Sequence, residues 1–247
     1  MDRPVVIVTG ALSGIGAATA VEFAALGARL VLADRSLAGE AEVVARVASA
    51  GGDAVAVEAD VRDYAQVEPL AAVALDRWSR IDVLVANAGI ADQSPMHSGD
   101  PARWRAVLET NLLGTIHAVR AVLPHMLSRR EGHIFVTASV SGREAYAGEP
   151  VYIASKWGQV GFAHSLRLEV MDAGIRVTLV EPGIVDTPLT RDNPVVRPLL
   201  EAVEPLAPED VARAIVFAYR QPDHVVLSEL TIRPVRQPLP DFGRRDH

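Results

Sequence analysis

A glycine-rich turn near the amino terminus constrains the fold of this chain more than any other feature. The segment Thr9-Gly10-Ala11-Leu12-Ser13-Gly14-Ile15-Gly16 follows an apolar run over residues 5–8. Such a signature arises by chance only about once in several thousand chains of this length. Glycines let the backbone approach a phosphate without Cβ clashes, and the helix expected from Gly14 onward offers free N–H groups and a positive dipole end. The spacing differs from the commoner Gly-x-Gly-x-x-Gly. We predict a dinucleotide-binding turn, with a purely structural turn as the alternative.

Short β-rich runs alternate with alanine-rich helical stretches along the whole chain. We expect strands near residues 5–9, 29–33, 54–59, 83–86, 134–138, 176–180 and 225–232. We expect helices near residues 14–26, 37–50, 64–78, 101–128, 151–172 and 208–219. This alternation predicts βαβ units and a parallel sheet, which right-handed crossovers make doubly wound. The fold class is therefore α/β, a single Rossmann-type domain over residues 1–247 with a seven-stranded parallel sheet and helices on both faces.

Composition narrows the possible functions. The chain has 247 residues, 49% of them apolar, and a net charge of −7. An acidic chain is a poor match for nucleic acid, which needs a basic face. The absence of cysteine removes disulfides, thiol nucleophiles and thiolate metal sites, and we expect no metal. No apolar stretch approaches the ~20 residues of a membrane span, and no signal peptide is apparent, so we expect a cytoplasmic protein without a membrane partner.

Two acidic positions bear on the choice of dinucleotide. Asp34 ends the second expected strand, 18 residues after Gly16. A carboxylate there can accept hydrogen bonds from ribose hydroxyls and repel a 2′-phosphate, which favours NAD over NADP. Arg35 follows directly and could attract that phosphate, so NADP stays open. Asp60 and Val61 follow the third strand and could flank the adenine, although a solvated loop acid is the alternative.

A second motif points to proton transfer. Tyr152 and Lys156 are four residues apart on an expected helix, so they share one face. A phenol with a pKa near 10 is a poor base at neutral pH, but a nearby ammonium lowers that pKa. We therefore expect Tyr152 to exchange a proton with a hydroxyl or carbonyl oxygen as a hydride moves.

Ser139 lies thirteen residues before Tyr152, at the end of the fifth expected strand. Its hydroxyl could orient the substrate oxygen and stabilise charge that develops there. A serine nucleophile is the rival interpretation, but the surrounding Thr-Ala-Ser-Val-Ser-Gly lacks the Gly-x-Ser-x-Gly elbow. Ser141 is a second candidate whose spacing to Tyr152 is shorter by two residues.

With these motifs in order, the chain resembles the classical short-chain dehydrogenase/reductase family from about residue 5 to residue 234. The turn from Thr9 to Gly16 resembles the family's cofactor turn. Asn87-Ala88-Gly89 resembles its Asn-Asn-Ala-Gly motif, with Ala86 in place of the first Asn. Pro182-Gly183-Ile184-Val185-Asp186-Thr187 resembles its segment beside the nicotinamide. The ending Glu229–Pro234 is similar to that of a subgroup of the family that often uses NADP. In that subgroup, however, an Arg usually takes the place of Asp34.

The resemblance implies a role for each matching residue. Lys156 would hydrogen-bond the nicotinamide ribose, and Asn111 would belong to a water relay that carries protons from Lys156 to solvent. Helix bending or packing is the alternative for Asn111, because Asn is a mediocre helix former. Thr187 and the backbone of Val185 would bond the carboxamide. The catalytic set is Asn111, Ser139, Tyr152 and Lys156. The cofactor set is Gly10, Ser13, Gly14, Ile15, Gly16, Asp34, Arg35, Asp60, Val61, Asn87, Ala88, Gly89, Lys156, Pro182, Gly183, Val185 and Thr187.

The substrate is constrained less well. Residues 188–208 follow a strand end and contain five prolines, so they form a candidate lid, and residues 235–247 form an irregular tail. We expect the substrate pocket to be bounded by residues 90–94, residues 141–146 and the lid from Leu189. It would take a secondary alcohol or ketone. Arg143 or Arg191 could meet an anionic group, with solvated arginines as the alternative.

Two other functions remain open. One is an NADP-dependent carbonyl reductase on the same scaffold. The other is a non-catalytic, dinucleotide-binding regulator.

Small residues at Ala154, Gly158 and Gly161 permit close approach of another helix. A contact within the molecule is the alternative. Because the family pairs the helix over residues 151–172 and the helix over residues 101–128 across a two-fold axis, we expect a homodimer or homotetramer.

Overall fold

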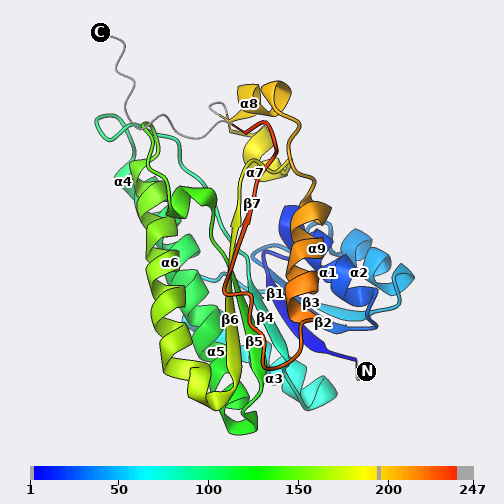
Figure 1. Cartoon of the computed structure of the whole chain (residues 1–247). Coiled ribbons are helices and arrows are strands. Elements are labelled where there is room, and N and C mark those ends of the chain that lie inside the picture. Colours follow the sequence, from blue (N-terminus) through cyan, green and yellow to red (C-terminus); the bar gives the residue numbers. More distant parts are fainter. Residues whose placement is uncertain (1–2, 194–195, 238–247) are drawn as a thin grey trace.

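The protein folds around one parallel sheet. The structure, a computed structural model, describes residues 3–193 and 196–237. Within these ranges seven strands pair in the order β3-β2-β1-β4-β5-β6-β7, all of them parallel. The strands are β1 (Val5–Thr9), β2 (Arg29–Asp34), β3 (Asp53–Glu58), β4 (Val83–Ala86), β5 (Gly132–Thr137), β6 (Ile175–Pro182) and β7 (Glu229–Ile232). The strand order reverses direction between β1 and β4, which confirms the doubly wound α/β fold (Figure 1).

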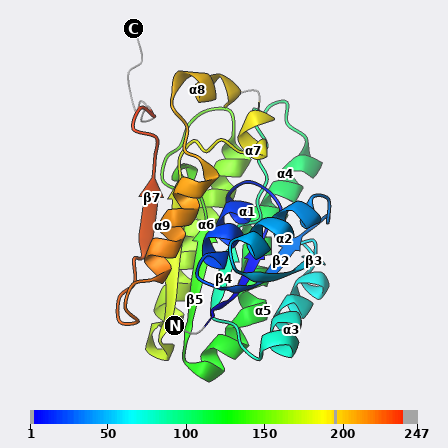
Figure 2. The ribbon, with the colours of Figure 1, turned by 90° about the vertical axis from the view of Figure 1, so that its right-hand side faces the viewer.

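Helices cover both faces of the sheet. One face carries α1 (Gly14–Ala24), α2 (Glu40–Ser49) and α9 (Pro208–Tyr219), which lie in front of the sheet in Figure 2. The other carries α3 (Tyr64–Trp78), α5 (Gly114–Arg129) and α6 (Pro150–Val170), with α4 (Pro101–Leu108) beside α6. Alternate strand residues enter opposite cores: Val6 and Val8 pack towards α1 and α9, whereas Val5 and Ile7 pack towards α3 and α5.

The burial of each strand follows its place in the sheet. Every residue of β1, β4 and β5 is buried, as expected for continuous apolar runs covered on both faces. The edge strands β3 and β7 are only partly buried. Parallel strands bring all their carboxyl ends to one edge, where the predicted site residues converge. Of the helices described here, none is long and apolar enough to cross a membrane.

Several elements differ from the sequence expectation. The long helix expected over residues 101–128 is α4, a π-helical turn η1 (Glu109–Leu113) and α5. The last strand begins at Glu229 rather than near residue 225. The segment over residues 188–208 holds two short helices, α7 (Pro188–Arg191) and α8 (Arg197–Ala202). Most of the tail predicted to be irregular, residues 238–247, lies outside the described residues.

Candidate active site

The glycine turn joins the end of β1 to the start of α1. Gly10 and Gly14 have φ angles of +63° and +49°, in the left-handed region that favours glycine. A Cβ atom on Gly16 would overlap the carbonyl oxygen of Gly10 and lie 2.8 Å from Nδ2 of Asn87. The turn therefore tolerates no side chain at Gly16, because the start of α1 packs directly onto the backbone of Gly10.

The segment after β4 holds this turn in place. The Asn87 side-chain amide donates hydrogen bonds to the carbonyl oxygens of Thr9 (3.2 Å) and Gly10 (3.1 Å). The Thr9 hydroxyl accepts from the backbone N–H groups of Asn87 (3.1 Å) and Ala88 (3.2 Å). These bonds tie the ends of β1 and β4 together, so the motif Asn87-Ala88-Gly89 supports the glycine turn mechanically.

Asp34, at the end of β2, and Asp60, just after β3, both line a cavity at the carboxyl edge of the sheet. The Asp34 carboxylate accepts a hydrogen bond from the Leu12 backbone N–H at 3.2 Å, which fixes it beside the glycine turn. Asp60 accepts from the Arg62 guanidinium at 2.9 and 3.0 Å. That hydrogen bond lowers the pKa of Asp60. Arg35 lines the same region of the cavity.

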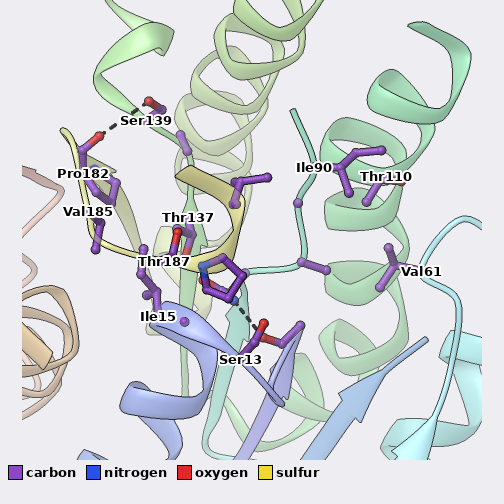
Figure 3. Close-up of a pocket in the computed structure, with 18 of the residues that line it drawn as sticks. Ser13, Ile15, Val61, Ile90, Thr110, Thr137, Ser139, Pro182, Val185 and Thr187 are labelled. Atoms are coloured by element: carbon purple, nitrogen blue, oxygen red, sulfur yellow. Dashed lines mark hydrogen bonds between the residues drawn. The ribbon is translucent and has the colours of Figure 1, made fainter. Parts of the chain in front are cut away.

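A cavity of about 330 Å³ opens along the carboxyl edge of the sheet. In Figure 3, Ser139, Pro182 and Val185 lie on one side of it, and Ile90, Thr110 and Val61 lie on the other. It brings together all the predicted site residues except Gly16 and Asn111. The predicted residues that line it are Gly10, Ser13, Gly14, Ile15, Asp34, Arg35, Asp60, Val61, Asn87, Ala88, Gly89, Ser139, Tyr152, Lys156, Pro182, Gly183, Val185 and Thr187.

Tyr152 and Ser139 meet in this cavity. Desolvation by burial raises the pKa of Tyr152 to about 12, and it outweighs the effect of the neighbouring Ser139 hydroxyl, which lowers that pKa. The Ser139 oxygen also accepts from the Ser141 backbone N–H at 3.1 Å, and the Ser139 hydroxyl lies 3.2 Å from that of Ser141. The direction of the Tyr152 shift is opposite to the sequence expectation, because burial outweighs the favourable interactions.

Lys156 is the only lysine in the sequence, and it is 5% exposed. Its ammonium donates to the carbonyl oxygen of Thr137 (3.2 Å) and to Oε1 of Gln159 (2.9 Å). Nζ lies 5.7 Å from the centroid of the Tyr152 ring. Desolvation lowers the pKa of Lys156 to about 7. Burial therefore shifts the pKa values of Tyr152 and Lys156 in opposite directions.

Asn111 lies in the π-helical turn and is fully buried. Its side-chain oxygen accepts from the Ile90 backbone N–H (2.8 Å), and its amide donates to the Ile90 carbonyl (2.9 Å) and the Ser155 hydroxyl (3.0 Å). Its own carbonyl oxygen accepts from the Thr115 hydroxyl at 2.7 Å. The side chain thus connects η1 to the segment after β4 and to α6, one residue before Lys156.

The charged residues proposed for the substrate pocket are occupied elsewhere. Arg143 pairs with the buried Glu181 (2.5 Å) and with Glu229 (2.8 Å). Arg191 pairs with Asp186 at 2.6 Å. Neither arginine lines the cavity. Because both guanidinium groups are already paired with carboxylates of the chain, these arginines are not free to bind an anionic substrate group in this arrangement.

Sequence reasoning missed several residues that line the cavity. They are Ala59, Arg62, Thr110, Thr137 and Ala138. Most of them immediately precede or follow a predicted residue at a strand end. The general rule that ligands bind at the carboxyl ends of parallel strands could have found Thr137 and Ala138. Residues 3–193 and 196–237 contain no group of three or more His, Asp or Glu side chains placed to hold a metal ion.

The family follows from comparison with known proteins. Residues 4–195 match the family model described as short chain dehydrogenase. An uncharacterized oxidoreductase of Staphylococcus saprophyticus is 38% identical over 236 residues, which cover 95% of this chain and 99% of that protein. The chain therefore belongs to the short-chain dehydrogenase family, which confirms the resemblance seen in the sequence.

Solved structures agree with this assignment. The crystal structure of levodione reductase has a TM-score of 0.84 and 31% sequence identity, covering 94% of this chain and 95% of that one. An alcohol dehydrogenase from the archaeon Thermococcus sibiricus, complexed with 5-hydroxy-NADP, has a TM-score of 0.88 and 26% identity. That match covers 96% of this chain and 99% of the archaeal chain. Both therefore share the overall fold described above over nearly the whole chain.

Proposed function

We propose that this protein is an oxidoreductase that interconverts a secondary alcohol and a ketone by hydride transfer with a nicotinamide dinucleotide, preferably NAD. The observation that carries the proposal is the convergence of Ser139, Tyr152 and Lys156 in the cavity that the glycine turn also lines. A protein that only binds a dinucleotide needs the glycine turn but not these three side chains. An acid–base group, an oxygen-orienting hydroxyl and an ammonium beside it are the components of a proton-transfer site.

The residues present fit a dinucleotide. Gly10 and Gly14 line the cavity. A Cβ atom on Gly10 would lie 2.8 Å from Cα of Ala88, and one on Gly14 would lie 3.1 Å from Cγ2 of Thr187, so neither position leaves room for a side chain. The turn would hold the pyrophosphate at the start of α1. Asp34 would accept from the ribose hydroxyls, and Val185 and Thr187 would bond the carboxamide. When bound, the nicotinamide would supply the hydride chemistry.

Each step of the proton chemistry falls to a named atom of the chain. In alcohol oxidation, the Tyr152 phenolate oxygen accepts the hydroxyl proton as the hydride leaves carbon. In ketone reduction, the Tyr152 phenol donates that proton to the carbonyl oxygen. The Ser139 hydroxyl orients the substrate oxygen and stabilises its charge. The Lys156 ammonium favours the phenolate, and its third N–H would hold the nicotinamide ribose.

NADP is the alternative cofactor. Arg35 and Arg62 both line the cavity near Asp34, and either could attract a 2′-phosphate. The archaeal alcohol dehydrogenase with a similar fold was solved with an NADP derivative. Against this, the Asp34 carboxylate is held in the cavity by Leu12, and Arg62 is already bound to Asp60. We therefore retain NAD as the preferred cofactor.

Residues 188–208 are proposed as the substrate lid. Pro188, Leu189 and Thr190, all in α7, line the cavity on the side of Thr187. The Thr190 hydroxyl donates to the Val185 carbonyl at 2.5 Å and accepts from the Thr187 N–H at 3.0 Å, so the start of α7 is capped by the segment that follows β6. A secondary alcohol or ketone next to Ser139 and Tyr152 would lie beneath α7.

A homodimer or homotetramer is proposed from the outer face of α6 and η1. Trp157, Leu168 and Leu113 are 51%, 70% and 40% exposed. Exposed large apolar side chains of this kind are typical of interfaces. Gly158 packs inside the molecule, since a Cβ there would lie 2.8 Å from Cδ2 of Leu112, whereas Gly161 faces open space.

Tyr152→Phe tests the proposal, because it removes the phenolic oxygen and keeps the ring. We expect NAD(H) to raise the melting temperature of the variant as it does for the unaltered protein, while turnover of a panel of secondary alcohols falls by about 10²–10⁴-fold. Tyr64→Phe is the matched control: the Tyr64 hydroxyl bonds Glu68 outside the cavity, so its loss should leave turnover unchanged. Unimpaired turnover by Tyr152→Phe would refute the assignment. Dinucleotide binding by the unaltered protein without turnover of any alcohol or ketone would favour a regulator.

A further inference from the structure

Gln159 is a buried polar residue next to the proposed catalytic residues. It lies in α6, three residues after Lys156, and is fully buried. Its side-chain oxygen accepts from the Lys156 ammonium at 2.9 Å, and its side-chain NH₂ donates to the Thr115 hydroxyl at 2.8 Å. A buried amide with both ends bonded is strongly oriented, because either end would be costly to leave without a partner.

Thr115 fixes the direction of this amide. A hydroxyl has one proton to donate, and the Thr115 hydroxyl gives its proton to the Asn111 carbonyl oxygen at 2.7 Å. It can therefore only accept from Gln159. The NH₂ group of Gln159 must then face Thr115, and the oxygen must face Lys156. The bonds from Asn111 through Thr115 to Gln159 thus present Lys156 with a group that only accepts.

The ammonium of Lys156 has three N–H donors. The Thr137 carbonyl and the Gln159 oxygen take two of them. The remaining N–H belongs to a group that lines the cavity. We propose that Gln159 is a positioning residue that keeps Lys156 in its ammonium form and leaves one N–H for the cavity. The inference rests on the proposed function for the meaning of that ammonium, but the arrangement itself can be tested without turnover.

The surroundings of Lys156 make such an acceptor consequential. Burial lowers the pKa of Lys156 to about 7, so near neutral pH small changes in hydrogen bonding decide whether it is charged. Two titratable groups lie on this side of Lys156. Tyr152 is one helical turn earlier in α6, with its ring centroid 5.7 Å from Nζ, and the charge of Glu149 raises the pKa of Tyr152. Thr137 from β5, and Asn111 and Thr115 from η1 and α5, are uncharged.

The test uses the fact that Lys156 is the only lysine. Protein grown with lysine labelled with ¹³C at Cε gives a single lysine side-chain resonance, whose shift with pH reports the pKa of Lys156 directly. Gln159→Leu removes the acceptor at similar volume, and Gln159→Glu keeps an acceptor and adds a negative charge. We expect Gln159→Leu to lower the pKa of Lys156 by about one unit, a tenfold change in its protonation constant, and Gln159→Glu to raise it.

Two further variants complete the experiment. Gln221→Leu, just after α9, makes the same substitution at a site where the amide donates to the Phe217 carbonyl, and should leave the titration unchanged. Thr115→Val removes the hydroxyl that orients the amide, and should shift the titration in the same direction as Gln159→Leu. It takes the place of Gln159→Leu if that variant does not fold.

The outcomes separate this inference from the proposed function. Titration of Lys156 in folded Gln159→Leu, or in Thr115→Val, at the same pH as in the unaltered protein would overturn the positioning role. A fall in pKa with Gln159→Glu would do the same. If the expected shifts appear but no dinucleotide or alcohol is processed by the unaltered protein, the proposed function fails while the role of Gln159 stands. As a secondary measurement in an active enzyme, the pH profile of kcat with NAD and cyclohexanol should move with the Lys156 titration.

Discussion

His133 provides a quantitative test of the buried interior of the sheet. It lies in β5, is 1% exposed, and its ring stacks on Phe135 with centroids 4.0 Å apart. Its Nε2 lies 2.8 Å from the Thr178 hydroxyl, and Nδ1 has no hydrogen-bond partner among the described residues. Burial, with a smaller contribution from the positive charge of Arg176, depresses the pKa of His133 well below its usual 6.5. The ring is therefore neutral in the folded protein.

The sign and size of the effect follow from this depression. Because the unfolded chain takes up a proton near pH 6.5 and the folded chain does not, the stability contributed by neutral His133 is fully present above pH 6.5. It is lost as the pH falls below 6.5. At pH 5.0, about 1.5 units below the unfolded pKa, the loss for a ring that stays neutral in the folded protein is about 2 kcal/mol. For a domain of this size that corresponds to a fall of about 4–8 °C in melting temperature.

Urea unfolding at pH 8, 7, 6 and 5 would measure this loss. His133→Phe removes the titrating group and costs a pH-independent amount through the unpaired Thr178 hydroxyl, so only the slope is compared. His224→Asn, at an exposed site, is the control and should follow the unaltered protein. We expect the unaltered protein to lose about 2 kcal/mol more than His133→Phe between pH 8 and pH 5. Parallel curves would show that His133 is charged in the folded state, and the burial argument would fail.

Two further predictions concern the cofactor site. Gly16→Ala should abolish the rise in melting temperature produced by NAD(H) and lower the unfolding free energy by about 1–3 kcal/mol, since its Cβ would overlap the Gly10 backbone. Gly161→Ala, in open space on α6, should change stability by at most about 1 kcal/mol in the favourable direction; equal effects of the two substitutions would contradict the close packing of the turn. Asp34→Ala should improve the ratio of NADP to NAD affinity about tenfold or more by removing a like charge from the 2′-phosphate position, as measured by titration of each dinucleotide. Asp53→Ala, at the exposed start of β3, should leave the ratio unchanged, and an unchanged ratio in Asp34→Ala would identify another residue as the reader of the ribose.

Local sequence signals predicted the sheet and the lining of the cavity well. The strands β1 and β4 carry short, uninterrupted apolar runs whose ends are marked by Thr9 and by Asn87. Because a parallel sheet gathers its carboxyl ends, placing each run was enough to place the residues that follow it. The glycine turn could also be predicted from the sequence, because the clash that a Cβ atom at Gly16 would make leaves little choice of residue there.

The parts that depend on distant partners could not be predicted in this way. The π-helical turn at Asn111 is stabilised by bonds to Ile90 and Ser155, 21 and 44 residues away, and no helical periodicity encodes such a break. The sequence alone gives Arg143 no partner, because its partner Glu181 lies 38 residues away in β6. Gln159 reads as one polar residue in an amphipathic helix until Thr115, 44 residues away, gives its amide a direction.

The opposite shifts of Tyr152 and Lys156 bear on the direction of the proposed reaction. Burial raises the pKa of Tyr152 to about 12, so the phenol holds its proton at neutral pH, which is the form required to donate to a carbonyl oxygen. Oxidation requires the phenolate and therefore a positive charge beside the ring. The ammonium of Lys156 provides that charge only while it stays protonated, and burial brings its pKa to about 7. The balance between reduction and oxidation in the proposed mechanism therefore depends on the hydrogen bonds that hold Lys156 charged, and Gln159 supplies one of the two that the chain provides.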